Sequence, residues 1–292
     1  MSHSSYLLLN DVRVHYLRWG LGQTRPVLML HGLASNARIW ELAAPYLASA
    51  GFDLVAPDAR GHGLTDKPDG DYGFKTFSGD LAALINALEF ERPLLVGHSW
   101  GALLALDYAV RFSVGQRSPL GIVLVDGAMA QLDASGSTWE EIRQRLTPPR
   151  LAGMAQEDFL ARLAESGSRW GMPEQAQQII LANFEISPEE TIAPHLTFER
   201  HMQIVRAMWE FQTYSQFTRL RCPALLVPSR PPEPRSEAEQ TYLALKEQGV
   251  ERILKALPGV RVHWMEDTIH DSPLQRPAEL AQVITEFASS LA

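Results

Sequence analysis

The chain has 292 residues, of which 46% are hydrophobic and 21% charged, a balance typical of a soluble globular protein and not of a disordered one. Its net charge of -8, without a Lys/Arg cluster, argues against nucleic acid as a partner. The single cysteine, Cys222, excludes an internal disulfide and a metal site built from several cysteines. The sequence shows neither a signal peptide nor a membrane-spanning stretch, so we expect a soluble, cytoplasmic protein that does not bind membranes.

The first half of the chain predicts strands that alternate with helices. We expect strands at 12–19, 27–30, 52–57, 94–96 and 121–125, and helices at 37–50, 77–90 and from Ala102 onwards. The strand at 12–19 partly alternates, as near a sheet edge, whereas the run at 27–30 is apolar throughout, which indicates burial on both faces. This order predicts a parallel sheet with helices on both faces, whose functional side chains lie at the carboxyl ends of the strands.

A sharp turn joins the strand that begins at Leu94 to the helix that follows it. The turn reads Gly97-His98-Ser99-Trp100-Gly101. A turn this tight strains its central residue and crowds its neighbours, so glycines two residues to either side are a steric requirement. We therefore expect the Ser99 hydroxyl to stand clear of the sheet, beside the backbone N–H of Trp100 at the start of the helix.

This turn resembles the nucleophile elbow of the α/β-hydrolases, Gly-x-Ser-x-Gly between a strand and a helix. The resemblance implies an α/β fold: a mostly parallel central sheet with helices on both faces, plus an inserted helical cap. We expect the first part of the core at 1–127, the cap at 128–218 and the second part of the core at 219–292.

The sequence His31-Gly32-Leu33 follows the strand at 27–30. A His-Gly pair at this place opens the oxyanion loop in the α/β-hydrolases, so the resemblance implies that the Leu33 N–H is a second oxyanion donor beside that of Trp100. We expect the side chain of His31 to be structural.

The loop after the strand at 52–57 begins at Asp58 and is similar to the family's Asp-x-Arg-Gly-x-Gly-x-Ser loop. Gly61-His62-Gly63 could suggest a dinucleotide loop, but Asp66 occupies the place of the third glycine, so we reject that interpretation. We expect the side chain of His62 to be structural as well.

The alternation of predicted strands and helices stops after Asp126-Gly127, the two residues that follow the strand at 121–125. Up to about Thr218 the chain predicts helices separated by prolines, too long a stretch for a plain loop. Within it, 196–211 carries apolar side chains at helical spacing, which usually indicates packing of a lid against the core.

The sheet is expected to resume at 224–227 and to end with a strand at 260–265. Helices are predicted at 236–248, 250–257 and from about 278 to 291. His270 lies in the loop after the last strand and matches the family's catalytic histidine, whereas His263 lies within that strand and is expected to have no catalytic role.

Ser99 needs a base, and the base needs a carboxylate that fixes its tautomer. The family usually places this acid after the strand at 224–227, but there the chain reads Pro228-Ser229-Arg230-Pro231-Pro232-Glu233-Pro234, with a proline near the expected position. Glu233 and Asp126 remain as candidates. We favour Asp126, because its strand end is regular and the proline-rich loop is typical of a rigid segment.

The resemblance implies a serine hydrolase that acts by acyl transfer, with Ser99, His270 and Asp126 as its catalytic residues and no metal or organic cofactor. An ester of a small or medium apolar acid is the expected substrate, because the cap contains Trp139 and two further tryptophans, Trp170 and Trp209, and no basic anion site. Serine at the elbow disfavours the dehalogenase and epoxide hydrolase branches, which use Asp there. Hydrolysis of a lactone, a thioester or a C–C bond, an aminopeptidase activity, and a non-catalytic ligand-binding role stay open as alternatives. The oligomeric state stays open too.

Overall fold

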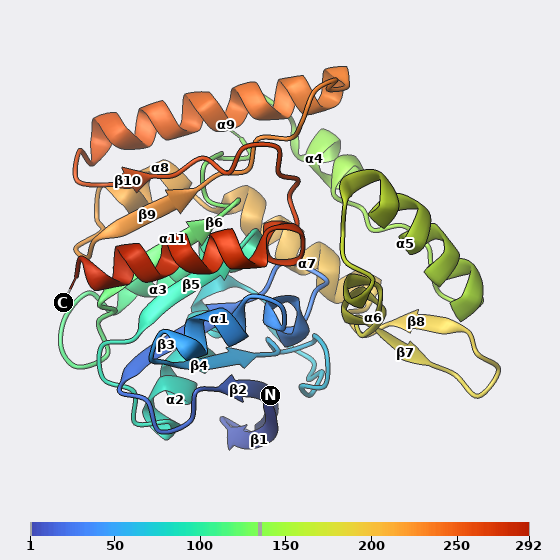
Figure 1. Cartoon of the computed structure of the whole chain (residues 1–292), viewed down its shortest axis with the longest axis horizontal. Coiled ribbons are helices and arrows are strands. Elements are labelled where there is room, and N and C mark those ends of the chain that lie inside the picture. Colours follow the sequence, from blue (N-terminus) through green and yellow to red (C-terminus); the bar gives the residue numbers. More distant parts are fainter. Residues whose placement is uncertain (1, 134–135, 292) are drawn as a thin grey trace.

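One sheet organises the residues that the computed structural model describes, 2–133 and 136–291. Within them, eight strands follow the spatial order β1-β2-β4-β3-β5-β6-β9-β10 (Figure 1). These strands are β1 (His3–Leu9), β2 (Val12–Trp19), β3 (Arg25–Leu30), β4 (Phe52–Pro57), β5 (Leu94–His98), β6 (Gly121–Val125), β9 (Ala224–Val227) and β10 (Arg261–Val262). The pairs β1–β2 and β2–β4 are antiparallel, and all pairs from β4 to β10 are parallel. The predicted mostly parallel sheet is confirmed.

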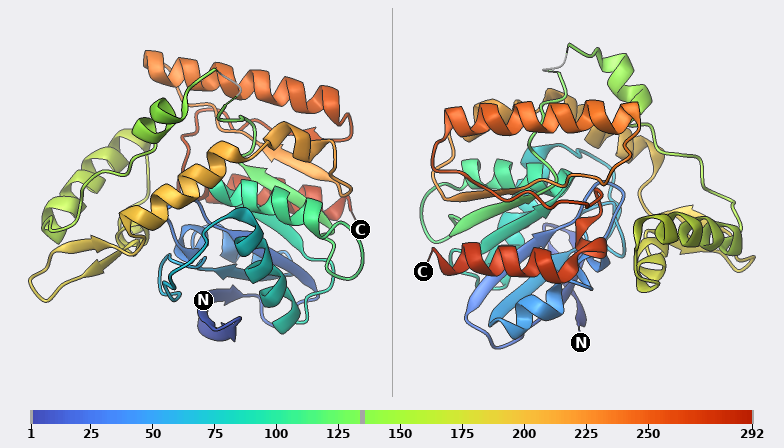
Figure 2. Two further views of the ribbon diagram at one scale, coloured as in Figure 1. Left: turned by 180° about the vertical axis from the view of Figure 1, so that it is seen from behind. Right: turned by 45° about the horizontal axis from the view of Figure 1, so that its top comes forward.

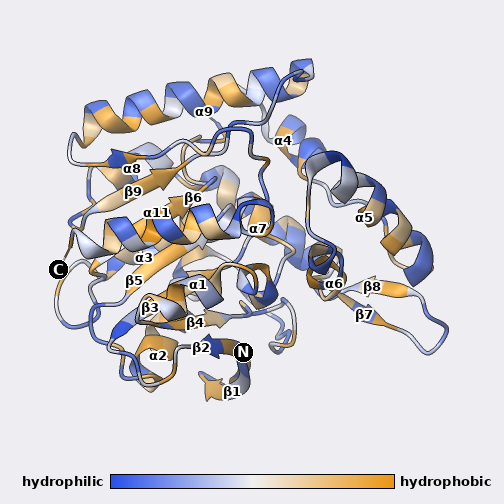
Figure 3. Ribbon diagram, viewed as in Figure 1, coloured by the Kyte–Doolittle hydropathy of each residue, from blue (hydrophilic) through white to orange (hydrophobic). Residues whose placement is uncertain are grey.

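Helices cover both faces of this sheet. They are the 3-10 helix η1 (Ala37–Trp40) and the α-helices α1 (Ala44–Ser49), α2 (Phe74–Ala87), α3 (Trp100–Arg111), α9 (Glu237–Ala256), α10 (Ser272–Gln275) and α11 (Pro277–Ser289). Successive strand residues point to opposite faces. In β6, Val123 and Val125 pack in the apolar cluster that contains α1 and α11, whereas Ile122 and Leu124 pack in the one that contains α2 and α3. Figure 3 shows β5, β6 and β9 in hydrophobic colours between these layers.

The residues between β6 and β9 form a separate group of elements, within the predicted cap at 128–218. It contains α4 (Trp139–Arg145), α5 (Gln156–Trp170), α6 (Gln175–Leu181), β7 (Phe184–Ile186), β8 (Ile192–Pro194), α7 (Phe198–Glu210) and α8 (Thr213–Phe217). Figures 1 and 2 show α5, α6 and the β7–β8 pair beyond the edge of the sheet to which the parallel strands point. The boundaries of the cap at 128 and 218 stay a prediction.

The expectation of helices alone in this segment was wrong, because β7 and β8 pair antiparallel as a hairpin. Pro188 lies in the hairpin turn and Pro194 closes the second strand, so neither separates two helices. The apolar stripe of α7 does pack as expected. Ile204 and Val205 are fully buried, and the Phe211 ring lies 4.3 Å from that of Phe74 in α2.

Two helix predictions differ from the structure for identifiable reasons. The single helix expected at 37–50 is η1 followed by α1, which begins beside Pro45 because proline fits the first turn of a helix and not its interior. The two helices expected on either side of Gly249 are one helix, α9. A Cβ at Gly249 would lie 1.6 Å from the backbone oxygen of Met129, so glycine serves there as a close-approach residue and not as a helix terminator.

The strands at the two ends of the sheet also differ from expectation. The sequence did not predict β1, which pairs with β2 and makes β2 the second strand from that edge. The last strand, expected at 260–265, is limited to Arg261–Val262. No helix within residues 2–133 and 136–291 is both long and apolar enough to cross a membrane.

Candidate active site

Ser99 stands on the strained turn between β5 and α3. Its backbone angles are φ 56° and ψ -119°, a conformation that non-glycine residues rarely adopt. The neighbouring glycines leave room for the turn: a Cβ at Gly97 would lie 2.2 Å from the Gly101 oxygen, and one at Gly101 would lie 2.4 Å from the Leu30 oxygen. Because these contacts are with backbone, no rotamer change could relieve them.

A continuous chain of hydrogen bonds links Ser99 to a buried carboxylate. The Ser99 hydroxyl lies 2.9 Å from Nε2 of His270, and Nδ1 of His270 lies 2.7 Å from Oδ2 of Asp126. When Nδ1 carries the proton, it donates to the carboxylate and leaves Nε2 free to accept from the hydroxyl. The His270 side chain is 46% exposed, whereas that of Asp126 is 1% exposed. The base is thus open to a substrate while the carboxylate is shielded from water.

The charges of His270 and Asp126 shift each other's pKa. Burial lowers the pKa of His270, but the hydrogen bond and the charge of Asp126 outweigh it, so the pKa is raised above its ordinary value of 6.5. Burial by itself raises the pKa of Asp126, yet the hydrogen bond and charge of His270, the charge of Lys246 and the Ser229 N–H together lower it to about 2. Asp126 is therefore ionised near neutral pH.

Of the two candidate acids, the structure brings Asp126 to His270 and leaves Glu233 elsewhere. The Glu233 side chain is 65% exposed, and its carboxylate lies 2.6 Å from the guanidinium of Arg235. The loop after β9 contributes a backbone group instead, since the Ser229 N–H donates to Oδ1 of Asp126 at 2.8 Å.

Sequence reasoning missed Lys246 on α9. Its Nζ lies 2.9 Å from Oδ1 of Asp126 and also donates to the Ser229 carbonyl oxygen. A signal was present: Lys246 shares its helix face with the buried Leu243, Val250 and Ile253, at spacings of three, four and seven residues. A lysine inside an apolar stripe points to a buried counter-charge.

His98, the residue before Ser99, was not predicted from the sequence either. Nε2–H of His98 donates to the backbone oxygen of His270 at 2.9 Å, and the two rings lie 4.9 Å apart. Burial lowers the pKa of His98 to about 4, so its ring is neutral near pH 7. The strand that ends before Ser99 is thereby tied to the loop that carries His270.

The two expected oxyanion donors flank Ser99. A Cβ at Gly32 would lie 3.2 Å from Cβ of Ser99, which places the loop leading to Leu33 against the serine. Trp100 is the first residue of α3, where backbone N–H groups have no partner within the helix. Their role in holding an oxyanion stays a prediction.

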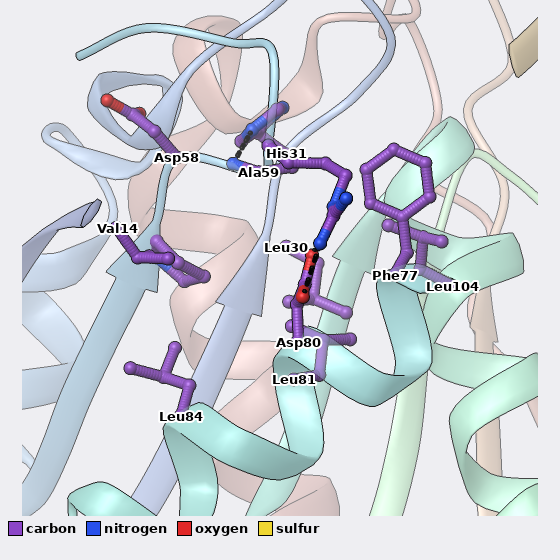
Figure 4. A pocket seen from close by; sticks show the side chains of 12 residues that line it. Val14, Leu30, His31, Asp58, Ala59, Phe77, Asp80, Leu81, Leu84 and Leu104 are labelled. Carbon is purple, nitrogen blue, oxygen red and sulfur yellow. Dashed lines mark hydrogen bonds and ion pairs between the residues drawn. The ribbon is translucent and has the colours of Figure 1, made fainter. Parts of the chain in front are cut away.

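Two histidines, His31 and His62, contact the residues beside these donors. Nδ1–H of His31 donates to the Gly32 oxygen at 2.7 Å. Its Nε2 accepts the Ala59 N–H at 3.0 Å, a contact that Figure 4 shows. The His62 ring stacks on Trp100, with centroids 5.4 Å apart. These contacts agree with the structural interpretation of both histidines. The cavity drawn in Figure 4 has a volume of about 30 Å³, enough for little more than a water molecule.

Two larger cavities meet near the oxyanion loop. One, of about 630 Å³, touches Leu33 on the oxyanion loop, Ile269 and Asp271 on either side of His270, and Trp170. The other, of about 640 Å³, lies between His62 on the core and apolar residues of the cap segment, among them Leu151, Phe184, Leu196 and Phe198. Trp139 and Trp209 instead pack against each other, with ring centroids 6.4 Å apart.

Comparisons with known proteins show which family and which proteins the chain is similar to. A family model described as alpha/beta hydrolase family matches residues 27–283. The chain is 37% identical over 98 residues to epoxide hydrolase 3 of Siraitia grosvenorii, a match that covers 33% of this chain and 30% of that protein. The curated relatives align with the chain over only 26% to 39% of their own length.

Two solved structures share nearly the whole fold at low identity. The chain superposes on E-2-(acetamidomethylene)succinate hydrolase with a TM-score of 0.78 and 20% identity, over 99% of this chain and all of the other. It superposes on the thioesterase domain from the curacin biosynthetic pathway with a TM-score of 0.76 and 18% identity, over 97% of this chain and 99% of that one. The match of the family model to most of the chain, together with the serine turn that lies within it, shows that the chain belongs to the alpha/beta hydrolase family.

Proposed function

We propose that the protein is a serine hydrolase that cleaves carboxylic esters of small or medium apolar acids through an acyl-enzyme intermediate. The observation that carries this proposal is the unbroken series of hydrogen bonds from the Ser99 hydroxyl through His270 to Asp126. A serine hydroxyl is a weak nucleophile near pH 7, and this arrangement supplies the base and the orienting carboxylate that it lacks.

In the proposed mechanism, the Ser99 oxygen attacks the ester carbonyl carbon while Nε2 of His270 takes the hydroxyl proton. The backbone N–H groups of Leu33 and Trp100 hold the carbonyl oxygen as it becomes negative. His270 then gives the proton to the leaving alcohol as the ester C–O bond breaks. In the second half, His270 takes a proton from water, the hydroxide attacks the acyl carbon, and the proton returns to Ser99 as the acid leaves.

One of the two large cavities supports an apolar acid as substrate. The walls of the 640 Å³ cavity are largely apolar, and the 630 Å³ cavity lies against both the oxyanion loop and the histidine loop. Cavities of this size hold small organic molecules. We infer that the acyl or alcohol group of the ester occupies one of them.

Three of the cap carboxylates give no support to the aminopeptidase alternative. Such an enzyme needs a free carboxylate for the substrate amine, but Glu140 and Glu210 lie 2.6 Å from Arg143 and Arg206 on their own helices. Glu141 closes the N-terminal turn of α4. Epoxide hydrolysis is disfavoured because Ser99 stands where that branch carries an aspartate.

A substrate panel tests the proposal. We expect p-nitrophenyl esters from acetate to octanoate to be hydrolysed with burst kinetics, faster than an aliphatic lactone, an acyl thioester, an aminoacyl anilide or a vinylogous diketone. Ser99→Ala measures the background. A clear preference for one of the other substrates would replace the ester assignment, and binding of ligands without turnover in native protein would favour the ligand-binding alternative.

A further inference from the structure

Lys246 occupies a position where a lysine is rarely found. The residue is 3% exposed and lies on the face of α9 that also buries Leu243, Val250 and Ile253. An ammonium group in such surroundings is strongly unfavourable unless it is paired and hydrogen-bonded. The partners of Lys246 therefore indicate what the buried charge does.

Nζ of Lys246 lies 5.1 Å from the centroid of the Tyr242 ring, and its hydrogen bonds go to one oxygen of Asp126 and to a backbone oxygen. Oδ1 of Asp126 accepts from Nζ of Lys246 at 2.9 Å and from the Ser229 N–H at 2.8 Å, while Nζ also donates to the Ser229 carbonyl oxygen. Oδ2 is left to His270. The carboxylate is thus fixed on one side by α9 and the end of β9, and its free edge faces the imidazole.

The charge of Lys246 has two opposite effects on the site. It lowers the pKa of Asp126 and so helps to keep this carboxylate ionised, and it lowers the pKa of His270 and so opposes the imidazolium that forms when His270 takes the serine proton. The hydrogen bonds of Nζ add a geometric effect, because they tie Oδ1 of Asp126 to the Ser229 carbonyl oxygen.

We propose that Lys246 is a positioning residue, whose ammonium group orients Asp126 so that Oδ2 stays aligned with Nδ1 of His270. This inference rests on the proposed hydrolase function. It assigns to α9, more than 100 residues along the chain from Asp126, a part in a site otherwise built from the ends of β3, β5, β6 and β9 and the loop of His270.

The first test is the Lys246→Met variant, which keeps the length of the side chain and removes its charge. On p-nitrophenyl acetate we expect kcat to fall about 10- to 100-fold with little change in KM, because misorientation of the base affects the transition state and not the binding of the ester. Lys255→Met on the exposed end of α9 is the matched control and should leave both constants unchanged. Wild-type kcat in a folded Lys246→Met protein would overturn the inference.

Two further measurements separate positioning from a general structural role. Lys246 lines a cavity of about 270 Å³ beside Asp126, which offers a path for a small amine. We expect propylammonium, but not propanol, to restore part of the activity of Lys246→Ala. In the double variant Asp126→Asn with Lys246→Met, which leaves no unpaired buried charge, kcat should equal that of Asp126→Asn alone. A further 10-fold loss in the double variant would contradict a role through Asp126.

The outcomes distinguish this inference from the proposed function. If native protein hydrolyses the ester and Lys246→Met does so equally well, only the role of Lys246 is overturned. If native protein hydrolyses none of the substrates in the panel, the proposed function fails first, and the inference fails with it.

Discussion

His98 donates a hydrogen bond from Nε2 to the backbone oxygen of His270, over 2.9 Å. The residue that precedes the candidate nucleophile thereby holds the loop that carries the candidate base. Because His98 is 3% exposed and its pKa is lowered to about 4, this bond persists with a neutral ring throughout the neutral pH range. The distance between Ser99 and His270 thus depends on a contact that neither of them makes through its side chain.

Removal of the His98 donor should loosen that loop. We expect His98→Leu, which keeps a similar volume, to lower kcat on p-nitrophenyl acetate about 10- to 100-fold. His98→Gln should retain more activity, because its amide N–H can still donate to the backbone oxygen. His263→Ala, at a side chain that is 45% exposed, is the control and should be silent. Equal kcat values for His98→Leu and native protein would contradict this role.

The two candidate acids differ sharply in their expected importance. Asp126→Asn should lower kcat by about 10³- to 10⁴-fold, since the amide cannot hold the productive tautomer of His270. Glu233→Gln should change kcat less than twofold, because Glu233 contacts Arg235 and not His270. Steady-state kinetics on folded variants, checked by thermal unfolding, decides between them, and the opposite ranking would refute the assignment.

The pH profile follows from the raised pKa of His270. The base acts only when neutral, so kcat/KM should fall on acidification with a midpoint above 6.5, the ordinary value for histidine. In Asp126→Asn the hydrogen bond to an anion is lost, and the residual activity should show this midpoint at lower pH. The measurement is kcat/KM between about pH 5 and pH 9. A midpoint that does not move in the variant would mean that Asp126 does not set the pKa of His270.

Two glycines within helices should respond in opposite ways to the same substitution. Gly249→Ala should lower the free energy of unfolding by roughly 2 kcal/mol or more, because the new Cβ would collide with the backbone oxygen of Met129. Gly167→Ala on α5 should raise it by about 0.5–1 kcal/mol through helix propensity, since its Cβ would meet Cβ of Met172 at an ordinary 3.5 Å. Urea denaturation compares the two, and similar destabilisation by both would show that the contact with Met129 is not the cause.

Local sequence patterns predicted those parts of the fold that depend on residues close together in the sequence. The turn at Ser99 is encoded within nine residues, and apolar runs mark the buried strands β3 to β6 and β9 whatever their partners are. The hairpin β7–β8 and the short β10 were misjudged because their extent depends on what they pack against. The positions of Pro188 and Pro194 are equally compatible with a break between two helices and with a hairpin.

The candidate site shows the same division. Ser99 and His270 follow from a motif and from a position in the strand order. The structure brings Asp126 to His270, but the sequence alone left Glu233 open, because only the folded loop after β9 shows where that carboxylate lies. Lys246 and His98 act across distances of 120 and 172 residues along the chain, so their partners could not be identified from local sequence.

The proposed function depends on Ser99 being an activated nucleophile. Intact-mass spectrometry after treatment with a fluorophosphonate tests it most directly, on native protein, Ser99→Ala and His270→Ala. We expect one adduct on native protein, none on Ser99→Ala, and labelling of His270→Ala slowed by at least about 10²-fold, the lower range of what a positioned general base contributes. An unlabelled native protein, or equal labelling of Ser99→Ala, would contradict it.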